Sequence, residues 1–289
     1  MGSGVESRVC LTFDFDAFSL WMSRGMVTPG PLSRGEFGAH AVPRILRLLA
    51  DRGISSTWFV PGHTAETYPD LCRKIVEAGH EVAIHGWNHE AISALDGGQE
   101  RDVLARAFES LQRVTGVAPT GNRSIPWDHS NNTVGLLLDL GVVYDSSLMS
   151  TDYTPYFTRT GDVCLPDVPY RFGDPSRLVQ LPVSWSLDDY PLFEYFRASD
   201  YVMPGLRTPH DVFGNFYDDV RYMVREEPGG VCVVTFHPQV IGRGHRMLGL
   251  EAFLDRLDEL PIVYDRCDNI AHTFLGENID GHGDARRSK

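Results

Sequence analysis

Apolar residues recur along this chain with two alternating periods. Short apolar runs, typical of strands buried on both faces, are followed by segments in which apolar residues return at helical spacing. The runs predict strands at 8–15, 56–60, 81–84, 119–121, 142–145, 178–183 and 231–236. The segments between them predict helices at 35–52, 65–78, 99–115, 131–140 and 250–260. This alternation predicts an α/β fold with a parallel sheet or barrel.

Two stretches lack a clear period. Residues 150–180 are rich in Asp, Pro, Gly and Tyr, so we expect long loops there over one end of the domain. The aromatic-rich stretch 193–222 could line a substrate site or a subunit contact, although core packing is the commoner role of such rings. Because no repeat or linker divides the chain, we expect one catalytic domain over 1–275 and a polar, frayed tail over 276–289.

Composition and charge narrow the classes of partner. A formal charge of −13, from 39 acidic and 26 basic residues, argues against nucleic acid or an anionic membrane as a partner. The sequence has no run of eighteen apolar residues and no secretory pattern at its start, so we expect a cytoplasmic protein. Five widely spaced cysteines without a Cys-x-x-Cys pair predict reduced, mostly buried thiols and no cysteine-zinc knuckle.

Charged side chains stand at the carboxyl ends of several predicted strands. Asp14 and Asp16 end the first strand, and the period of two places both on one face. An aspartate after a strand often caps a turn, but a buried carboxylate is costly without a cation, hydrogen bonds or a metal. Arg123 could hold a carboxylate through two parallel hydrogen bonds, although a surface arginine beside a turn fits the local sequence equally well. His237 directly follows the last strong strand.

Two histidines follow the third predicted strand. If this segment forms a helical turn, His85 and His89 project from the same side and can bind one metal ion. The spacing alone is weak evidence, because such pairs arise by chance in chains of this length. Their place at the carboxyl end of a strand, where α/β folds carry their chemistry, strengthens the prediction of a metal site.

Taken together, these motifs resemble the polysaccharide deacetylase family, also called the NodB-homology family or carbohydrate esterase family four. Each motif alone is weak, but five in the family's order over residues 8–260 are specific. The motifs are Thr12-Phe13-Asp14-Phe15-Asp16, His85-x-x-x-His89, Arg123-x-x-Pro126, Leu181-Pro182-Val183-Ser184-Trp185 and Thr235-Phe236-His237-Pro238.

The resemblance implies a distorted, incomplete (β/α) barrel that hydrolyses a non-peptide amide C–N bond by attack of a metal-bound water. The positions that match the family's ligands to zinc or a similar divalent metal are Asp16, His85 and His89. The positions that match its general base, its general acid and the residue that orients the base are Asp14, His237 and Arg123. These roles agree with the chemistry, because three protein ligands leave room for water and a carbonyl oxygen.

Two departures from the usual family pattern indicate a particular branch. Phe15 separates Asp14 from Asp16, where most members have adjacent aspartates, and the third motif has one residue more than usual between Arg123 and Pro126. In both features the chain resembles one branch of the family, which contains peptidoglycan-deacetylase-like proteins, cyclic imide hydrolases and metal-independent allantoinases. Members of this branch tend to have a closed pocket. Because the three ligand positions are kept, we expect a metal-dependent member. The residues expected to contact substrate are Trp87, Pro126, Trp127, Trp185 and Asp188.

The motifs leave the substrate open between an N-acetylated amino sugar and a small cyclic imide or ureide. The family name favours the sugar, whereas the lack of an export signal favours a small soluble substrate; we favour the deacetylase slightly. An iron(II) oxygenase would leave Asp14 and His237 without a role. A glycosidase that pairs Asp14 with Asp188 or Asp189 would leave both histidines without one. A non-catalytic binding protein on the same scaffold is the remaining alternative, and a homo-oligomer is plausible.

Overall fold

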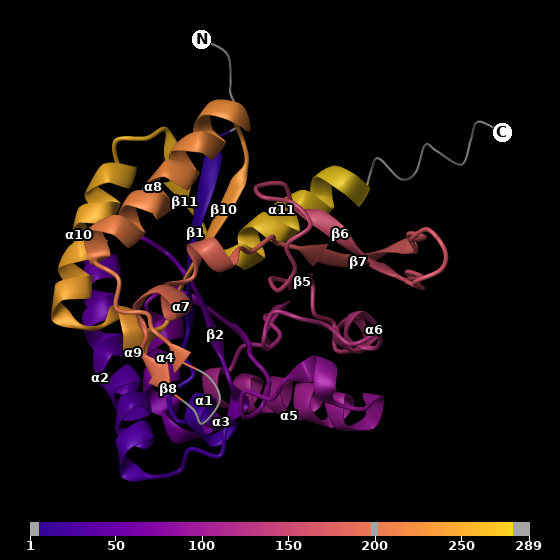
Figure 1. The fold of residues 1–289 in the computed structure, drawn as a ribbon, viewed down its shortest axis with the longest axis horizontal. Coiled ribbons are helices and arrows are strands. Elements are labelled where there is room, and N and C mark those ends of the chain that lie inside the picture. The colour runs from indigo at the N-terminus through magenta and orange to yellow at the C-terminus, as the bar shows by residue number, and fades with distance from the viewer. Residues whose placement is uncertain (1–5, 198–201, 280–289) are drawn as a thin grey trace.

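The computed structural model describes residues 6–197 and 202–279, and its centre is a curled sheet that forms part of a barrel (Figure 1). The strands lie in the order β10-β1-β2-β3-β4-β5-β7-β6, and β11 also pairs with β1. Neighbours from β10 to β7 are parallel, whereas β6 runs antiparallel to β7. The predicted incomplete (β/α) barrel is confirmed. Its strands are β1 (Ser7–Asp14), β2 (Thr57–Val60), β3 (Glu81–Ile84), β4 (Gly121–Asn122), β5 (Tyr144–Asp145), β6 (Tyr156–Thr160), β7 (Asp174–Gln180), β10 (Val231–Phe236) and β11 (Ile262–Tyr264).

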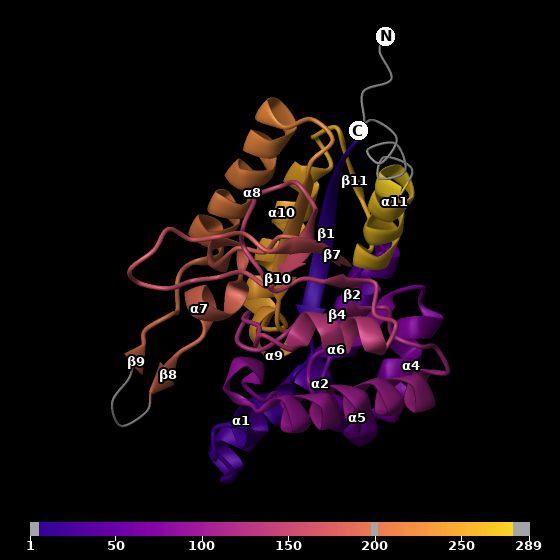
Figure 2. The same ribbon diagram turned by 90° about the vertical axis from the view of Figure 1, so that its right-hand side faces the viewer.

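Helices connect the strands and cover most of the sheet. Helices α8 and α10 lie on one side of β1 and β10, and α11 lies on the other side (Figures 1 and 2). A two-stranded ribbon, β8 (Phe196–Arg197) with β9 (Val202–Met203), stands apart from the main sheet. The helices are α1 (Ser19–Met22), α2 (Pro29–Asp51), α3 (Gly62–Thr67), α4 (Pro69–Glu77), α5 (Gly97–Thr115), α6 (Thr133–Asp139), α7 (Asp189–Phe193), α8 (Pro209–Glu226), α9 (Pro238–Ile241), α10 (Gly244–Leu257) and α11 (Cys267–Ile279). No helix in the described ranges is long and apolar enough to cross a membrane.

The two faces of the sheet bury different side chains. In β1, Val9, Leu11 and Phe13 join the large core beneath the outer helices. Cys10 points the other way, because successive side chains alternate, and joins a smaller core that we call the interior core. The interior core also contains Phe59, Ala83, Val179, Val231, Val233, Cys267 and Ile270. Apolar residues therefore fill the amino-terminal part of the barrel interior, with α11 packed against them.

The stretch 150–180, where we expected long loops, contains two strands, and residues 161–173 between them form a loop. Residues Tyr156–Thr160 and Asp174–Gln180 pair as the antiparallel hairpin β6–β7. The prediction missed the hairpin because its half-exposed strands carry one proline, one aspartate and two arginines and show no apolar alternation. The predicted helix over 65–78 is likewise divided, since Pro69 begins α4 directly after α3.

The carboxyl-terminal part of the domain also differs from the prediction. Strand β11 and helix α11 were not predicted, and α11 includes residues 276–279 of the expected tail. The rest of that tail, 280–289, lies outside the described residues. Four of the five cysteines are buried as predicted, whereas Cys164 is exposed. In the aromatic-rich stretch, Phe213 and Phe216 pack in the large core, as their common role suggests.

Acid should destabilise this fold partly through His80. His80 is buried, and its Nδ1 lies 3.1 Å from the backbone nitrogen of Ser56, which donates to it. Burial, with the nearby charge of Arg266, lowers the pKa of His80 to about 4. A histidine in the unfolded chain binds its proton at a higher pH, near its ordinary pKa of about 6.5. We therefore expect the free energy of unfolding to fall as the pH is lowered from about 6.5 towards 4.

Urea denaturation at pH 7 and pH 4.5 measures this loss. In His80→Gln, which retains an acceptor but does not titrate, the difference between the two pH values should be smaller than in the wild type. An unchanged difference would show that other groups cause the acid sensitivity.

Candidate active site

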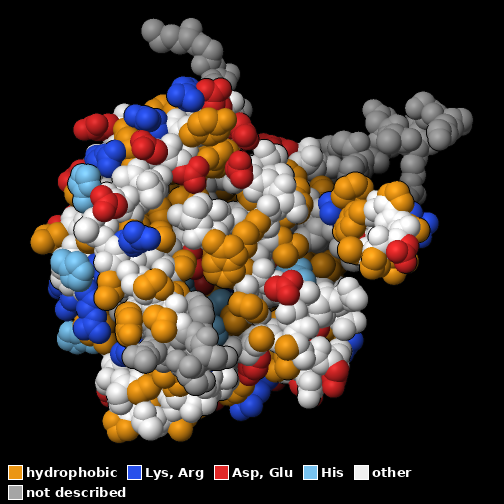
Figure 3. Space-filling model, viewed as in Figure 1, with side chains coloured by type: hydrophobic (Ala, Val, Ile, Leu, Met, Phe, Trp, Pro, Cys, Tyr) orange, Lys and Arg blue, Asp and Glu red, His pale blue; other side chains and the backbone are white. Residues whose placement is uncertain are grey.

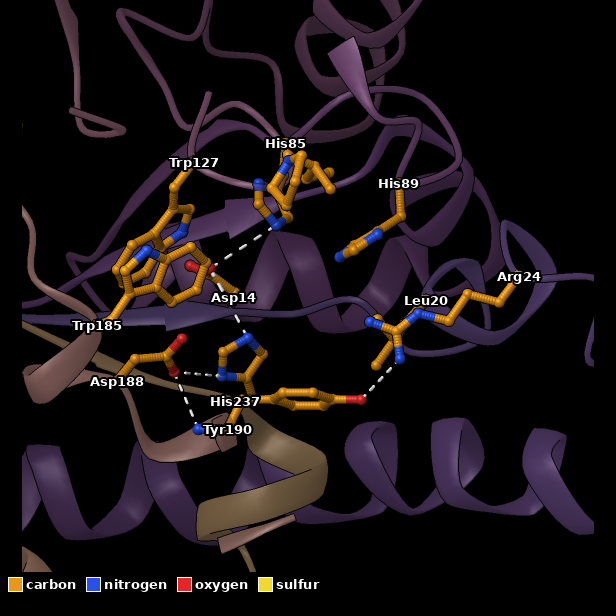
Figure 4. A pocket seen from close by; sticks show the side chains of 12 residues that line it. Asp14, Leu20, Arg24, His85, His89, Trp127, Trp185, Asp188, Tyr190 and His237 are labelled. Carbon is orange, nitrogen blue, oxygen red and sulfur yellow. Dashed lines mark hydrogen bonds and ion pairs between the residues drawn. The ribbon is translucent and has the colours of Figure 1, made fainter. Parts of the chain in front are cut away.

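The predicted catalytic residues converge at the carboxyl end of the barrel interior: Asp14 and His237 face each other in the close view (Figure 4), and Arg123 contacts Asp14. Asp14 is the last residue of β1, His85 follows β3, Arg123 follows β4 and His237 follows β10. In the space-filling view, histidine side chains are visible at the bottom of a hollow near the middle of the face (Figure 3). The period of two that turns Cys10 inward also turns Asp14 inward, so the sheet itself points the carboxylate into the site.

A buried ion pair joins Arg123 to Asp14. Arg123 is fully buried, and its Nη1 lies 2.7 Å from Asp14 Oδ1 and 3.0 Å from Thr12 Oγ1. Its Nε and Nη2 donate to the carbonyl and hydroxyl of Ser146 at 2.9 and 3.0 Å. Burial opposes ionisation of Asp14, but the charges of Arg123, His85 and His237 outweigh it and hold the pKa of Asp14 below its ordinary value. Asp14 is therefore an ionised carboxylate in the interior.

Asp16, His85 and His89 form a set of donors that fits a divalent metal. Asp16 Oδ1 is buried and accepts no hydrogen bond from any described residue. The Nε2 atoms of His85 and His89 lie 3.5 and 3.8 Å from this oxygen. His85 Nδ1 is 2.7 Å from the carbonyl oxygen of Arg123, which fixes a proton on Nδ1 and leaves Nε2 as a ligand. Two imidazoles and one carboxylate are typical ligands of a catalytic zinc site, and a ligand histidine commonly donates its other N–H to a carbonyl oxygen, as His85 does.

The two histidines come together in a turn that is not helical, so the predicted geometry of this segment is wrong. Gly86 and His89 have φ values of +65° and +60°, in the left-handed region. Glu90, which the sequence analysis missed, accepts hydrogen bonds from the backbone N–H groups of Trp87 and Asn88 at 2.9 and 2.8 Å. These bonds hold the turn and thereby position His89 beside His85.

His237 faces Asp14 and Asp16 across the site. Its Nε2 lies 3.9 Å from an oxygen of each, and its Nδ1 lies 2.8 Å from Asp189 Oδ1. Burial would lower the pKa of His237, but Asp188 and Asp189 outweigh it and raise the pKa to about 10. The imidazole is therefore protonated and can donate a proton.

Asp188, Asp189 and His237 form a second group whose geometry could hold a cation. Their polar atoms already bond one another and the backbone: Asp189 accepts from the backbone N–H of His237 at 3.1 Å, and Asp188 from that of Tyr190 at 2.9 Å. A protonated imidazole also repels a metal ion. The set that contains the unsatisfied oxygen of Asp16 is therefore the better metal site.

A cavity of about 90 Å³ opens above these groups. Four of the five expected substrate contacts line it, namely Pro126, Trp127, Trp185 and Asp188. The rings of Trp127 and Trp185 stack with centroids 4.3 Å apart, and half of Trp185 is exposed. The fifth, Trp87, is placed outside this cavity: its ring packs under the guanidinium of Arg106, 3.5 Å from ring centroid to Cζ.

Other residues of the cavity wall were not predicted. They are Leu20, Arg24, Ile125 and Tyr190. Tyr190 follows the Asp188-Asp189 pair, and because Asp188 was an expected substrate contact, this proximity in sequence could have indicated Tyr190 as well. Leu20 and Arg24 belong to a short helix and the turn after it, and no spacing or strand end marks them in the sequence.

Comparisons with known proteins identify the family of the chain. The family model for polysaccharide deacetylase matches residues 3–144. A peptidoglycan deacetylase from Helicobacter pylori is 35% identical over 288 residues, which cover 94% of this chain and 98% of that protein. A crystal structure from Mycobacterium smegmatis, assigned to the polysaccharide deacetylases, matches with a TM-score of 0.83 and 31% identity over 96% of this chain and 93% of that one.

A more distant structure shares the fold alone. The Puue allantoinase matches with a TM-score of 0.73 and 22% identity over 94% of this chain and 91% of that one. The alignments to the Helicobacter pylori and Mycobacterium smegmatis proteins span nearly the whole chain at more than 30% identity, and the family model also matches. The chain belongs to the polysaccharide deacetylase family, which hydrolyses carbon–nitrogen bonds other than peptide bonds.

Proposed function

We propose that this protein is a metal-dependent hydrolase that removes the acetyl group from an N-acetylated amino sugar. The observation that carries the proposal is the buried, unsatisfied oxygen of Asp16, which faces the Nε2 atoms of His85 and His89. An ionised carboxylate, Asp14, and a protonated imidazole, His237, lie beside it. An amide hydrolase needs these three elements: a cation site, a proton acceptor and a proton donor.

Asp16, His85 and His89 would hold the metal, and zinc suits a set of two imidazoles and one carboxylate. A divalent metal bound there would lower the pKa of a coordinated water towards about 7 and polarise the amide carbonyl. The chain's own residues supply the proton transfers. Two neutral histidines and one Asp16 carboxylate would leave a divalent metal with net positive charge, which would attract a carbonyl oxygen.

Asp14 is the proposed general base. Arg123 fixes one oxygen of its carboxylate, Oδ1, which leaves Oδ2 directed towards the histidines, 3.7 Å from His85 Nε2. That oxygen can take a proton from the attacking water. Arg123 therefore has a positioning role, because it orients the base and keeps it ionised.

His237 is the proposed general acid. Asp189 bonds Nδ1, so Nε2 carries the proton that faces the cavity. Donation of this proton to the amide nitrogen lets the amine leave. After the transfer, Asp188 and Asp189 can draw a new proton to the imidazole, because both carboxylates contact its Nδ1 side.

Ring opening of a small cyclic imide or ureide is the second candidate. The observation that favours it is the small cavity, about 90 Å³ against roughly 300–1,000 Å³ for common ligand pockets. A cavity of this size accepts an acetyl group or a small ring, and a sugar ring would have to lie mainly outside it. Both reactions use the same acid, base and metal, so only the products separate them.

Chelation and product analysis test the proposal and its alternative. We expect turnover of an N-acetylglucosamine oligomer, with release of acetate, to be lost on chelation and restored by zinc. Turnover of succinimide without acetate release would favour the cyclic imidase. Unchanged activity after complete metal removal would contradict metal dependence.

Replacing Asp14 with Asn should greatly slow turnover while the protein stays folded. General acid–base groups contribute roughly 10²- to 10⁴-fold, so kcat should fall by about that factor. Asp70→Asn, on an exposed carboxylate of α4, is the matched control and should leave kcat unchanged. If Asp14→Asn kept full turnover, Asp14 would not be the base; if wild type bound ligand without turnover, the chain would be a binding protein.

Replacing Arg123 with Met should destabilise the fold, because it leaves the Asp14 carboxylate buried without its partner. The expected loss in free energy of unfolding is about 3–5 kcal/mol, measured by urea denaturation. The double variant with Asp14→Asn should recover part of the loss. Arg101→Met, which removes an exposed arginine 3.7 Å from Asp139, should cost less than about 1 kcal/mol. An equal, small effect of both arginine variants would contradict the role given to the buried pair.

A further inference from the structure

The cavity has two chemically different sides. Trp127 and Trp185 stack on one side, and Arg24 reaches in from the opposite side, with the catalytic groups between them (Figure 4). Arg24 lies in the turn after α1 and its side chain is exposed. Because Arg24 also lines the cavity, a molecule that enters the cavity comes beside this side chain.

Arg24 is joined to the wall of the cavity by Tyr190. Its Nη1 donates a hydrogen bond of 2.9 Å to the Tyr190 hydroxyl oxygen, and its Cζ lies 5.7 Å from the centroid of that ring. The Tyr190 ring in turn lies 5.2 Å from the ring of His237. Because α7 holds Tyr190 and the same segment supplies Asp189, the guanidinium has a defined place relative to the proposed general acid.

The other charges of the cavity indicate that the positive charge of Arg24 favours an anionic ligand. Among the lining residues that the structure describes, Arg24 is the one that carries a guanidinium or ammonium group. The carboxylates that line the cavity already have cationic partners: Asp14 contacts Arg123, and Asp188, with Asp189 beside it, contacts His237. Neutralising these carboxylates therefore does not require Arg24. On a chain with a net charge of −13, a cation beside the reacting groups favours an anionic ligand.

We propose that Arg24 and Tyr190 bind a carboxylate of the substrate close to the amide that is cleaved. A guanidinium offers several N–H donors in a planar fork that matches a carboxylate. A phenol that accepts a hydrogen bond from the arginine still has its own O–H to donate. The stacked indoles would cover the apolar part of the same molecule.

This inference rests on the proposed function and narrows its substrate class to acidic N-acyl compounds. The shared chemistry is a carboxylate near an N-acetyl group. Such a carboxylate can come from an amino sugar with an ether-linked acid side chain or from a small N-acetyl amino acid. The neutral counterparts should bind less well, because they cannot pair with Arg24.

Two matched ligand pairs test the proposal by isothermal titration calorimetry on the full chain. The sugar pair is N-acetylmuramic acid and N-acetylglucosamine, and the small pair is N-acetylglycine and N-acetylglycinamide. In at least one pair, we expect the acid to bind roughly 10- to 100-fold more tightly than the neutral ligand, as a charge-assisted hydrogen bond implies. The pair that shows the preference identifies the source of the carboxylate.

Variants assign the preference to the two residues. In Arg24→Gln the ratio of the two dissociation constants should fall to near one, and Arg24→Lys should restore part of it. Tyr190→Phe keeps the ring and removes the hydroxyl, and should reduce the ratio by roughly 2- to 10-fold. Arg73→Gln, which removes an exposed arginine of α4, is the control and should keep the full ratio. Melting temperatures of all four variants show whether any loss comes from unfolding.

The outcomes separate this inference from the proposed function. Equal affinity of the wild type for acid and neutral ligand in both pairs would overturn the carboxylate site, whether or not the enzyme releases acetate. An equal loss for both ligands in Arg24→Gln would also overturn it, since that result indicates a structural role. A clear preference for the acid without turnover of any amide would support the carboxylate site and contradict the proposed function instead.

Discussion

The Arg123–Asp14 pair is the interaction on which the rest of the site depends. A full positive charge and a full negative charge lie inside the barrel, and neither is exposed to water. The pair is tolerable because every nitrogen of the guanidinium has an acceptor: Asp14 and Thr12 on β1, and Ser146 after β5. The same bonds span the interior from one strand to another, so the pair fixes the shape of the site as well as its charge.

The arrangement of the interior follows from the alternation of side chains along the strands. On β1, Cys10 is apolar and lies in the interior core, whereas Thr12 and Asp14 are polar and lie further along the same face. Helix α11 packs at the amino-terminal end of this face, where the backbone N–H of Cys267 donates to Thr57 at 2.9 Å. Water is excluded from one end and charges are gathered at the other. Such a division would place the proposed acid, base and metal site beside an apolar wall of low dielectric constant, where electrostatic interactions are strong.

The sequence predicts the residues of the site better than it predicts their geometry. Strand ends and family motifs predicted that Asp14, Asp16, Arg123 and His237 lie together, and they do, because parallel strands bring their carboxyl ends to one edge. His85 and His89 were chosen correctly as neighbours, but through a helical turn that does not form. The structure shows how the pair is held, through the left-handed backbone at His89 and the backbone N–H groups of Trp87 and Asn88 that donate to Glu90.

Residues outside the strand ends were harder to predict for a physical reason. Trp87 lies within the histidine motif, yet its ring packs under Arg106, because tertiary contacts and not spacing decide where a loop side chain points. Arg24 reaches the cavity from the turn after a four-residue helix, where no period links sequence to position. The hairpin β6–β7 is stabilised by pairing between two strands that residues 161–173 separate, and the periodicity within each strand does not reveal this pairing.

The central claim is that one divalent metal binds between Asp16, His85 and His89. Anomalous X-ray diffraction from crystals grown with zinc locates the ion directly. We predict a single strong peak bounded by the Asp16 carboxylate and the Nε2 atoms of the two histidines. A peak at Asp188, Asp189 and His237 would contradict the assignment of the ligands. So would the absence of a peak inside the barrel in a crystal that binds zinc fully at other places. Either result would also contradict the proposed roles of Asp14 and His237.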